Sequence, residues 1–531
     1  MTNSQAAQDA NARAAAAYAR GVSAFEAGDL AAAEEIFAAL VRQDPRLHQV
    51  WNALCLVALQ AAMPEAALER ARHAVKLDRK SVEYLNNLGV ASGELGEFNE
   101  AEQAFRRALK LKPVYVEARF NLAKLLHKQG RLAESLKEFE RAHAMDPASV
   151  KVQHGLTEAY QANGLPGRAL EMLRAADAIA NPGILTSSYA MCLADVEGPA
   201  AALSWLRQCL PRESGGRFTH GPLGVTALAM GQWLEGWKYY CLYYRERRAP
   251  GSIPTLTPLP ARLDGKRILL RPDQGLGDTL FFLRFADELR QRGASVTLSC
   301  EPRLASLLRG ERPFAVVSQG AEHGPWDWDL AMTDLPAMLE TQAVPPAVPV
   351  YVDDSARQRA RDLLRRLGPG PYLGVTWRGG KDMLREREFG AGRPILFKEA
   401  PPALLGRALQ GLRGTMVGIQ RGATPAEFEA MSAAVGAPVH DVALSDGDLQ
   451  GIAALLEALD DYVTVSNTNV HILAGLNRRA KVLVTHPPYW RWMREGASVW
   501  FPDFALYRQP SSRDWSEPLA RLRADLLRER V

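Results

Sequence analysis

The chain contains 531 residues, a length that corresponds to three or four folded domains rather than one. Its 64 Lys and Arg residues nearly balance 60 Asp and Glu residues, so the net charge of +4 does not favour binding to the phosphate backbone of nucleic acid. The content of 47% hydrophobic and 23% charged residues is that of an ordinary globular protein and excludes wholesale disorder and a membrane bundle.

The cysteines and the apolar segments bear on the cellular compartment. The five cysteines show neither a CxxC pair nor a zinc-finger spacing, and their odd number argues against a disulfide framework. The N-terminus lacks the basic region of a secretory signal, and the most apolar later stretch, residues 50–63, is too short to cross a bilayer. We therefore expect a cytoplasmic protein without a membrane span.

A 34-residue repeat runs through the first half of the chain. Positions that share one slot of this repeat carry the same small or apolar residue. They include Gly28, Gly96, Gly130 and Gly164; Leu54, Leu88, Leu122 and Leu156; and Ala33, Ala67, Ala101 and Ala169. The pattern resembles the tetratricopeptide repeat, a helix-turn-helix unit. Because one unit cannot bury its apolar stripe alone, we predict an α-helical solenoid over residues 1–248, with five clear units and two degenerate ones.

The repeat also predicts a binding role for the first half of the chain. Stacked units of this kind present a concave face that suits an extended protein or peptide segment. The alternative is a spacer or a dimerisation element. Ten of the eleven tryptophans come after residue 200, so we expect the last units to cap the array against the domain that follows.

A proline-rich linker at residues 249–262 separates the array from a region with a different pattern. Beyond it, short β-rich runs alternate with helical patterns, which is typical of a parallel sheet. The runs are residues 267–271, 296–300, 315–318, 373–377, 416–420, 462–465 and 481–484. The rhythm restarts after Gly368, so we expect two α/β, Rossmann-like domains at residues 263–368 and 369–531. Ligands of such domains bind beyond the carboxyl ends of the strands.

The loop after the first of these strands carries Gly275, Gly277 and Asp278 at the start of an amphipathic helix. Its sequence fits neither the dinucleotide-binding fingerprint nor the P-loop. The turn would expose backbone N–H groups and place Asp278 in a cleft, where its carboxylate could accept a proton from an acceptor hydroxyl. The alternative is that Asp278 is only the N-cap of the helix.

In the last domain, Ser466, Asn467, Thr468 and Asn469 follow a strand and open a helix. Unpaired N–H groups and the helix dipole favour a diphosphate at such a helix start. His471, one turn further on, is predicted either to donate to a phosphate or an acceptor, or to be a buried core histidine. A capped helix without a functional role is the alternative for the whole segment.

Further polar residues end the neighbouring strands. Arg378 and Lys381, which follow Trp377, suit the neutralisation of a leaving diphosphate, although the run from Lys381 also fits a solvated loop. Gln420 is placed to meet a nucleotide base or ribose. No metal site is predicted, because the histidines show no HxxxH or HExxH pairing and the DxD at residues 327–329 enters a strand.

Three segments, QGLGDTLFFLRF, GVTWRGGK and DLQGIAALLEALDDYVTVSNTNVHILAGL, resemble the GT-B glycosyltransferases, most closely the heptosyltransferase-like family. The resemblance spans about residues 263–515 and implies a GT-B fold with Asp278 as the catalytic base. It also implies a set of residues that hold the sugar nucleotide, namely Ser466, Asn467, Thr468 and His471. Ser466 stands where the family usually has Asp. An array followed by a GT-B fold is also similar to the O-GlcNAc transferases and the bacterial flagellin glycosyltransferases.

The sequence therefore predicts a metal-independent glycosyltransferase without a cofactor. Its donor would be a nucleotide sugar, a co-substrate bound in part by the turn of Gly275 and Gly277. Its acceptor would be a hydroxyl, Ser or Thr, of a protein held by the array. A glycan or lipid glycosyltransferase and a protein-binding adaptor with an inactive GT-B domain are the two alternatives.

Overall fold

The computed structural model of the chain describes residues 3–175, 183–213, 216, 218–249, 256–310, 314–379, 398–442 and 447–529. The chain divides into two compact units, Met1–Asn163 and Gly164–Val531. The first unit is helical along its described residues, whereas the second combines helices with two parallel sheets. The predicted helical solenoid and the predicted α/β region are both present. The two compact units meet after Asn163, inside the predicted array of residues 1–248. The predicted domain boundaries at residues 249–262 and at Gly368 stay a prediction.

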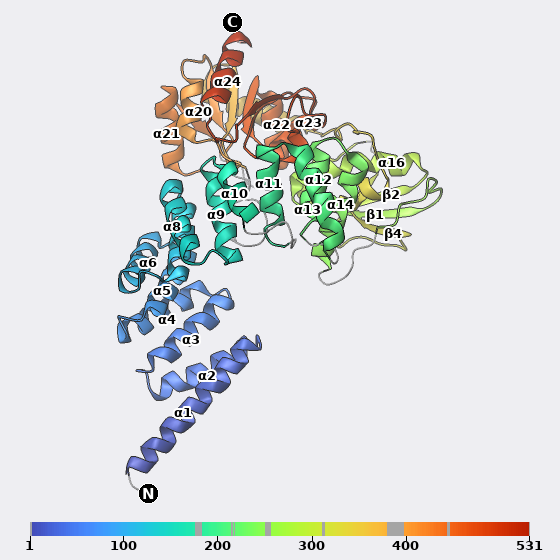
Figure 1. Cartoon of the computed structure of the whole chain (residues 1–531). Helices are drawn as coiled ribbons and strands as arrows, with labels where there is room; N and C mark the ends of the chain where they lie inside the picture. Colours follow the sequence, from blue (N-terminus) through green and yellow to red (C-terminus); the bar gives the residue numbers. More distant parts are fainter. Residues whose placement is uncertain are drawn as a thin grey trace. The chain divides into compact units, whose positions relative to one another are not determined.

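The first unit is a series of helices joined by short turns (Figure 1). In chain order they are α1 (Asn3–Glu26), α2 (Leu30–Gln43), α3 (His48–Gln60), α4 (Pro64–Leu77), α5 (Val82–Glu94), α6 (Phe98–Leu111), α7 (Val116–Lys128), α8 (Leu132–Met145) and α9 (Val150–Ala162). Gly28, Gly96 and Gly130 turn the chain with φ between +77° and +80°, and Ala62 takes the same slot with φ of +55°. Glycine recurs there because a left-handed turn strains other residues.

Close packing of small residues against aromatic rings holds each hairpin together. A Cβ atom added to Gly89 in α5 would lie 2.5 Å from the ring of Phe105 in α6. Phe105 and Phe139 are buried, as are Ala101 and Ala33 of the small-residue slot. Small residues at these positions let the paired helices approach closely.

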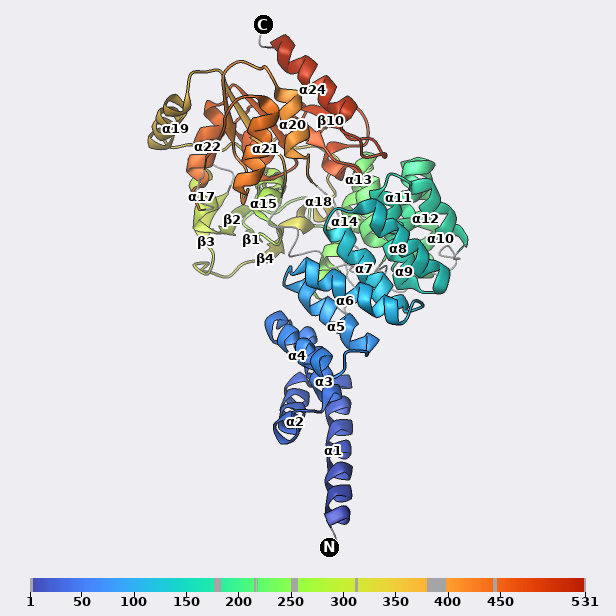
Figure 2. The ribbon, with the colours of Figure 1, turned by 90° about the vertical axis from the view of Figure 1, so that its left-hand side faces the viewer.

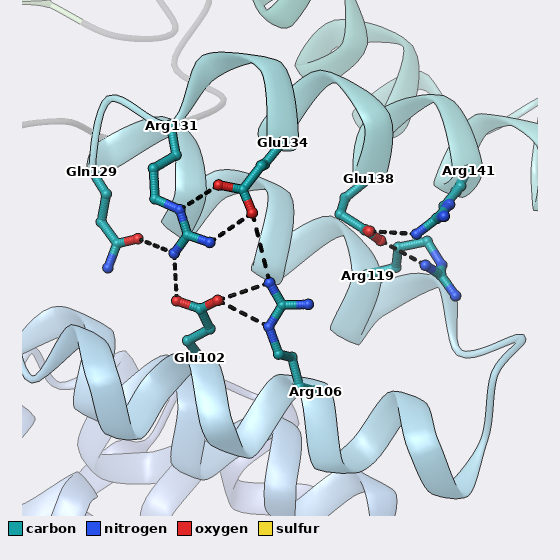
Figure 3. A network of polar contacts seen from close by, with 8 residues as sticks. All are labelled: Glu102, Arg106, Arg119, Gln129, Arg131, Glu134, Glu138 and Arg141. Carbon is teal, nitrogen blue, oxygen red and sulfur yellow. Dashed lines mark hydrogen bonds and ion pairs between the residues drawn. The ribbon is translucent and has the colours of Figure 1, made fainter.

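Ion pairs link helices of the first unit both within one hairpin and between successive hairpins (Figure 3). Arg131, at the start of α8, contacts Glu102 of α6 at 2.6 Å and Glu134 of α8 at 2.7 Å. Arg119 and Glu138 form a second pair at 2.6 Å with side chains only 11% and 10% exposed. Because the exposed pairs contribute little free energy, we interpret this network as fixing the register between repeats.

One carboxyl group in the array has an unfavourable environment. Burial raises the pKa of Glu158 in α9 to about 8, and the nearby Lys124 only partly opposes this shift. One carboxylate oxygen of Glu158 has no hydrogen-bond partner among the described residues. The folded chain therefore favours the neutral form of Glu158 at pH values where the unfolded chain carries the charge.

We expect Glu158→Gln to stabilise the first unit at pH 8, by up to about 4 kcal/mol, because the neutral amide avoids burying a charge. The raised pKa of Glu158 destabilises the folded chain only at pH values above the pKa of this group in the unfolded chain. The stability gained by Glu158→Gln should therefore shrink as the pH falls and disappear near pH 5. Thermal unfolding across this range measures the effect. Glu134→Gln, at an exposed carboxylate that pairs with Arg131, is the control and should show no gain at pH 8. A gain for Glu158→Gln that does not depend on pH would contradict the explanation.

Helical hairpins continue into the second unit (Figure 2). Their helices are α10 (Pro166–Ala175), α11 (Thr186–Val196), α12 (Pro199–Cys209), η1 (Leu210–Arg212), α13 (His220–Ala229) and α14 (Trp233–Arg248). Gly198 and Gly231, with φ of +97° and +73°, turn the chain between α11 and α12 and between α13 and α14. The two degenerate repeats are therefore helical hairpins, as predicted.

The first sheet has four parallel strands in the order β3-β2-β1-β4. Its strands are β1 (Arg267–Arg271), β2 (Ser295–Cys300), β3 (Ala315–Ser318) and β4 (Trp328–Ala331). Its helices are α15 (Leu276–Phe282), η2 (Leu283–Phe285), α16 (Ala286–Gln291), α17 (Pro302–Leu307), η3 (Met332–Asp334) and α18 (Leu335–Met338). The continuous apolar run of β1 is buried, which is typical of a parallel strand covered on both faces.

The second sheet has six parallel strands in the order β10-β9-β8-β5-β6-β7. Its strands are β5 (Tyr372–Thr376), β6 (Thr415–Gly418), β7 (Val439–Asp441), β8 (Asp461–Val465), β9 (Lys481–Val484) and β10 (Ala505–Arg508). Its helices are α19 (Asp354–Leu367), α20 (Pro402–Leu409), α21 (Pro425–Val435), α22 (Leu449–Ala458), α23 (Thr468–Gly475), η4 (Trp490–Trp492) and α24 (Ser516–Glu529).

Two separate apolar cores cover the faces of this second sheet. Helices α20, α21 and α24 bury their side chains with Val463 and Val465 of β8 on one face. Helices α19, α22 and α23 pack with Tyr462 of the same strand on the other face. The alternation along β8 thus places its side chains in two cores, as the pleat of a strand requires.

Each of the seven predicted runs agrees with a strand within about two residues, and β4 is the strand that the DxD at residues 327–329 was expected to enter. Two further strands of the described residues had no sequence signal. Both of these, β7 and β10, lie at an edge of the second sheet and are short. The amphipathic helix predicted after the first strand is divided into α15, η2 and α16. An edge strand buries fewer side chains, so its sequence lacks the continuous apolar run that marks a central strand.

The last hairpin of the array shares a core with the first sheet. Trp237 of α14 is 1% exposed and packs edge-on against Phe285, Trp490 and Trp500. Leu228 of α13 belongs to the same core as β1 and α15. The last hairpin therefore caps the α/β region, as the concentration of tryptophan after residue 200 predicts.

We expect Trp237→Ala to destabilise the second unit by about 3–5 kcal/mol, because it removes a large side chain from a closed aromatic core. Chemical denaturation followed by tryptophan fluorescence measures the loss. Trp51→Ala, which removes a partly exposed ring stacked on His73 in the first unit, is the control. Trp51→Ala should leave the transition of the second unit in place; equal shifts in both variants would contradict the assignment.

Candidate functional site

The predicted site residues follow the strands at which the order of strand addition in each sheet reverses. From β1 the chain continues to β2 and β3 on one side and then returns to β4 on the other. From β5 it continues to β6 and β7 on one side and then returns to β8 on the other. Such reversal points leave a crevice at the carboxyl ends of the strands where ligands bind. The loops after β1, β5 and β8 all leave the sheets at these points.

Two of these loops come into direct contact through Gly277 in α15. A Cβ atom added to Gly277 would lie 3.0 Å from His471 Cδ2 and 3.4 Å from Thr468 Cα, both in the first turns of α23. A Cβ atom on Gly379, after β5, would overlap the carbonyl oxygen of Ser466. Gly379 leaves no room for a side chain, and a side chain at Gly277 would be tightly packed, because the three loops lie close together here.

Asp278 lies in the first turn of α15. The N-cap of α15 is Gly275, so the alternative that Asp278 is the N-cap is wrong. The carboxylate of Asp278 instead forms an ion pair with Arg491, with 2.6 Å between Oδ1 and Nη2. The Asp278 side chain is 31% exposed, whereas that of Arg491 is 6% exposed. One side of the pair is thus buried and the other is open to a ligand.

Aromatic rings enclose the guanidinium group of Arg491. Its Cζ atom lies 4.1 Å from the centre of the Phe281 ring and 4.7 Å from that of Trp490. Burial lowers the pKa of Arg491, but Tyr489 and Asp278 outweigh this and hold the pKa above its usual value. Nε of Arg491 has no hydrogen-bond partner among the described residues. The site therefore holds a buried cation whose donors are not all used.

Lys398 is a second cation at this point. Its ammonium group lies 5.3 Å from the centre of the Tyr489 ring. Burial lowers the pKa of Lys398. The charge of Asp278 raises this pKa, whereas that of Arg491 lowers it further. We call Asp278, Lys398, Tyr489 and Arg491 the Asp278 cluster. An anion that entered it would relieve the unfavourable burial of positive charge.

His471 lies beside the cluster as a neutral ring. Burial, followed by the charges of Arg491, Arg284 and Lys398, lowers its pKa well below the usual value. The imidazole packs against Phe281 and Phe501, with ring centres 6.0 and 5.4 Å away. This environment favours the core histidine over a protonated phosphate ligand.

The start of α23 combines polar groups that fix the turn with groups that are open. Asn467 is the N-cap, and its side-chain oxygen accepts the N–H of Asn469 at 3.0 Å. The Asn469 amide donates to the hydroxyl of Tyr462 at 2.7 Å. Ser466 and Thr468 are partly exposed, and neither hydroxyl group forms a hydrogen bond within the described residues. These two hydroxyls are the side chains of the turn that can meet a ligand.

The residues after β5 are engaged in the structure itself. The side-chain oxygen of Gln420 accepts the N–H groups of Trp377 and Arg378 at 3.0 and 2.9 Å. Trp377 is fully buried, and Arg378 forms an ion pair with Glu427 at 2.7 Å. A phosphate would have to compete with Glu427 for Arg378, whose role in donor binding stays a prediction. Lys381 lies outside the described residues.

Sequence reasoning missed several members of the site. Lys398 follows a charged stretch and carries no motif. Arg491 lies in the aromatic run from Tyr489 to Trp492, and the structure buries Trp490 and Trp492. A cation between aromatic residues in a loop after a strand was the available signal. Tyr240 of α14, whose hydroxyl lies 3.4 Å from that of Tyr489, had no signal because it belongs to the helical repeat.

Two general features of the described residues complete the description. No group of three or more His, Cys, Asp or Glu side chains in this part of the chain is placed to hold a metal ion. Asp327 of the DxD is bound to Lys266 at 2.9 Å. Across the described ranges, no helix combines the length and apolarity needed to cross a membrane.

Comparison with known proteins identifies repeats in the first unit. Residues 93–150 match the tetratricopeptide repeat family, and such repeats imply a role in protein interaction. Protein FlbA of Caulobacter vibrioides is 26% identical over 329 residues, which are 56% of this chain and 52% of that protein. The chain thus matches about half the length of this curated relative.

Three solved structures that are similar to the chain each cover less than half of it. A tetratricopeptide repeat protein from Parabacteroides merdae is 16% identical, covers 45% of this chain and 93% of its own, and gives a TM-score of 0.37. PilF of Pseudomonas aeruginosa is 18% identical, with 38% and 92% coverage and a TM-score of 0.33. MamA is 24% identical, with 29% and 91% coverage and a TM-score of 0.28.

We expect Gly277→Ala to destabilise the second unit by about 1–3 kcal/mol, because its Cβ must displace the His471 ring and part α15 from α23. Thermal unfolding measures the loss. Gly275→Ala is the matched control, since its Cβ would meet only Asp278 Oδ2, at 3.9 Å, and its φ of −65° suits alanine. The contact between the two loops would be refuted if both variants unfolded at the wild-type temperature.

Proposed function

We propose that the second unit is a GT-B glycosyltransferase that moves a sugar from a nucleotide sugar to a hydroxyl of a protein bound by the helical array. One observation carries the proposal: an ion-paired carboxylate, Asp278, lies beside a helix start at the reversal points of two parallel sheets. The resemblance of the segments around Asp278 and Ser466 to this class supports the same function.

The donor would bind with its diphosphate at the start of α23. The free hydroxyls of Ser466 and Thr468 and the N–H groups of the first turn supply hydrogen-bond donors. Lys398 supplies a positive charge that burial has already stripped of part of its water. These groups would stabilise the negative charge that develops on the leaving diphosphate, without a metal ion.

Asp278 would act on the acceptor. In a direct displacement, the acceptor oxygen bonds to the anomeric carbon as the bond to the diphosphate oxygen breaks, and the hydroxyl proton passes to Asp278. The pair with Arg491 fixes one carboxylate oxygen of Asp278 in place. A weak base suffices because the hydroxyl becomes strongly acidic once its oxygen begins to bond to carbon.

The array offers polar groups that suit an extended protein acceptor. Amide side chains on the first helices of successive hairpins lie within hydrogen-bond distance of one another. Asn87 donates to Asn52 at 2.8 Å, and Asn121 donates to Asn86 at 2.9 Å. Carboxamides both donate and accept, so such a row matches the N–H and C=O groups of a peptide backbone.

The cysteines are compatible with a reducing compartment. All five are buried free thiols. A cytoplasmic enzyme would keep them in this state.

We expect nucleotide sugars to raise the unfolding temperature of the wild-type chain, since a ligand at a hundred times its Kd adds about 2.7 kcal/mol. Asp278→Asn should keep this shift and lower sugar transfer by at least about 100-fold, because the amide cannot accept the proton. Thermal shift with a panel of nucleotide sugars and a transfer assay with peptide acceptors measure the two effects.

Asp287→Asn, which changes an exposed carboxylate on α16, is the control and should transfer sugar at the wild-type rate. Wild-type rates in Asp278→Asn would remove Asp278 from the mechanism. If no nucleotide sugar binds the wild-type chain while proteins still bind the array, the second unit is an inactive fold in an adaptor.

A further inference from the structure

The loop that carries Arg491 leaves the carboxyl end of β9 and runs over residues 486–494. It delivers Tyr489 and Arg491 to the Asp278 cluster and contains the short helix η4. Asp278 itself is held by α15 on the first sheet. The pair between Asp278 and Arg491 therefore depends on how this loop is placed.

A single carboxylate in the helical part of the chain binds both ends of the loop. Asp195, near the end of α11, contacts His486 Nε2 at 3.0 Å and Arg494 Nη1 at 3.2 Å. Its side chain is only 4% exposed. Because a buried carboxylate must be paired, breaking these contacts is costly, and Asp195 closes the loop at its base.

Helix α14 contacts the middle of the same loop. Trp237 packs edge-on against Trp490, with ring centres 5.2 Å apart. The hydroxyl of Tyr240 lies 3.4 Å from that of Tyr489. Both α14 side chains are buried, so this surface is a rigid support directly behind the Asp278 cluster.

The placement of Arg491 requires such a support. A long side chain with three rotatable methylene groups is buried here against Phe281 and Trp490, and it meets Asp278 through one nitrogen. A shift of about 1 Å in the loop would separate this pair, and misplacement on that scale is known to reduce catalysis about 100-fold.

We propose that helices α11 and α14, which continue the array in sequence, position the loop at residues 486–494 so that Arg491 meets Asp278. Asp195 and Tyr240 are positioning residues that act through this loop. The catalytic meaning of the pair rests on the proposed function, but the positioning itself does not. The reaction site is then built from three parts of the chain: both sheets and the last helical hairpins.

The first test measures positioning without any substrate. Hydrogen exchange of the full-length chain should show at least about tenfold faster exchange at residues 486–494 in Asp195→Asn than in the wild type. The matched control is Glu197→Gln, two residues further along at the end of α11, whose carboxylate pairs with Arg174 instead of the loop. Equal protection of the loop in Asp195→Asn, Glu197→Gln and the wild type would overturn the proposal.

The second test separates positioning from general stability. With a transferable nucleotide sugar, Asp195→Asn should lower kcat and leave KM for the donor unchanged. In an Arg491→Lys background, Asp195→Asn should cause no further loss of kcat, because both changes disturb the same pairing of Arg491 with Asp278. Losses that multiply would show that Asp195 acts independently of Arg491 and would overturn the proposal.

Two outcomes keep the positioning and the proposed function distinguishable. If the wild-type chain transfers no sugar, the proposed function fails, and the exchange experiment still decides the positioning. If Asp195→Asn does not fold, Tyr240→Phe replaces it, since this change removes only the hydroxyl that faces Tyr489. Tyr240→Phe should then raise exchange in the loop, and wild-type protection would overturn the role of α14.

Discussion

Burial of the Arg491 guanidinium imposes the strictest physical constraint on the second unit. A charged group removed from water needs a nearby opposite charge, and the partner observed is Asp278 on a different sheet. The aromatic rings around Arg491 supply further attraction through their faces. The pair therefore ties a loop after β9 to the first turn of α15. Gly277, in the same turn of α15, lies in close contact with α23.

This constraint gives the helical hairpins a second role beside the one expected of repeats. In the first unit, the repeats form hairpins that carry a row of amide side chains, which we propose for a protein partner. In the second unit, a hairpin of the same type contributes Trp237 and Tyr240 to the α/β core. Each repeat contacts only its neighbours, so the last repeat can pack against a different kind of domain in place of a further repeat.

The polar groups at the site divide into those that build the loops and those that remain open. Gln420, Arg378 and Asn467 satisfy backbone groups or carboxylates within the protein. Lys398, Ser466 and Thr468 are the groups with capacity for a ligand. Residue type alone does not separate the two sets, because an amide or a guanidinium serves either purpose equally well.

The sequence by itself determined the helical repeat, the parallel strands and the loops in which chemistry is expected. These depend on the 34-residue repeat, on short β-rich runs and on glycines such as Gly275 and Gly277, all of which are visible in the local sequence. Only the tertiary structure decided that Asp278 pairs with Arg491, 213 positions away in the chain, and that Arg378 is bound by Glu427. Pairings of this kind arise from the packing of sheets and helices, and no local pattern encodes which distant charge will fill a buried position.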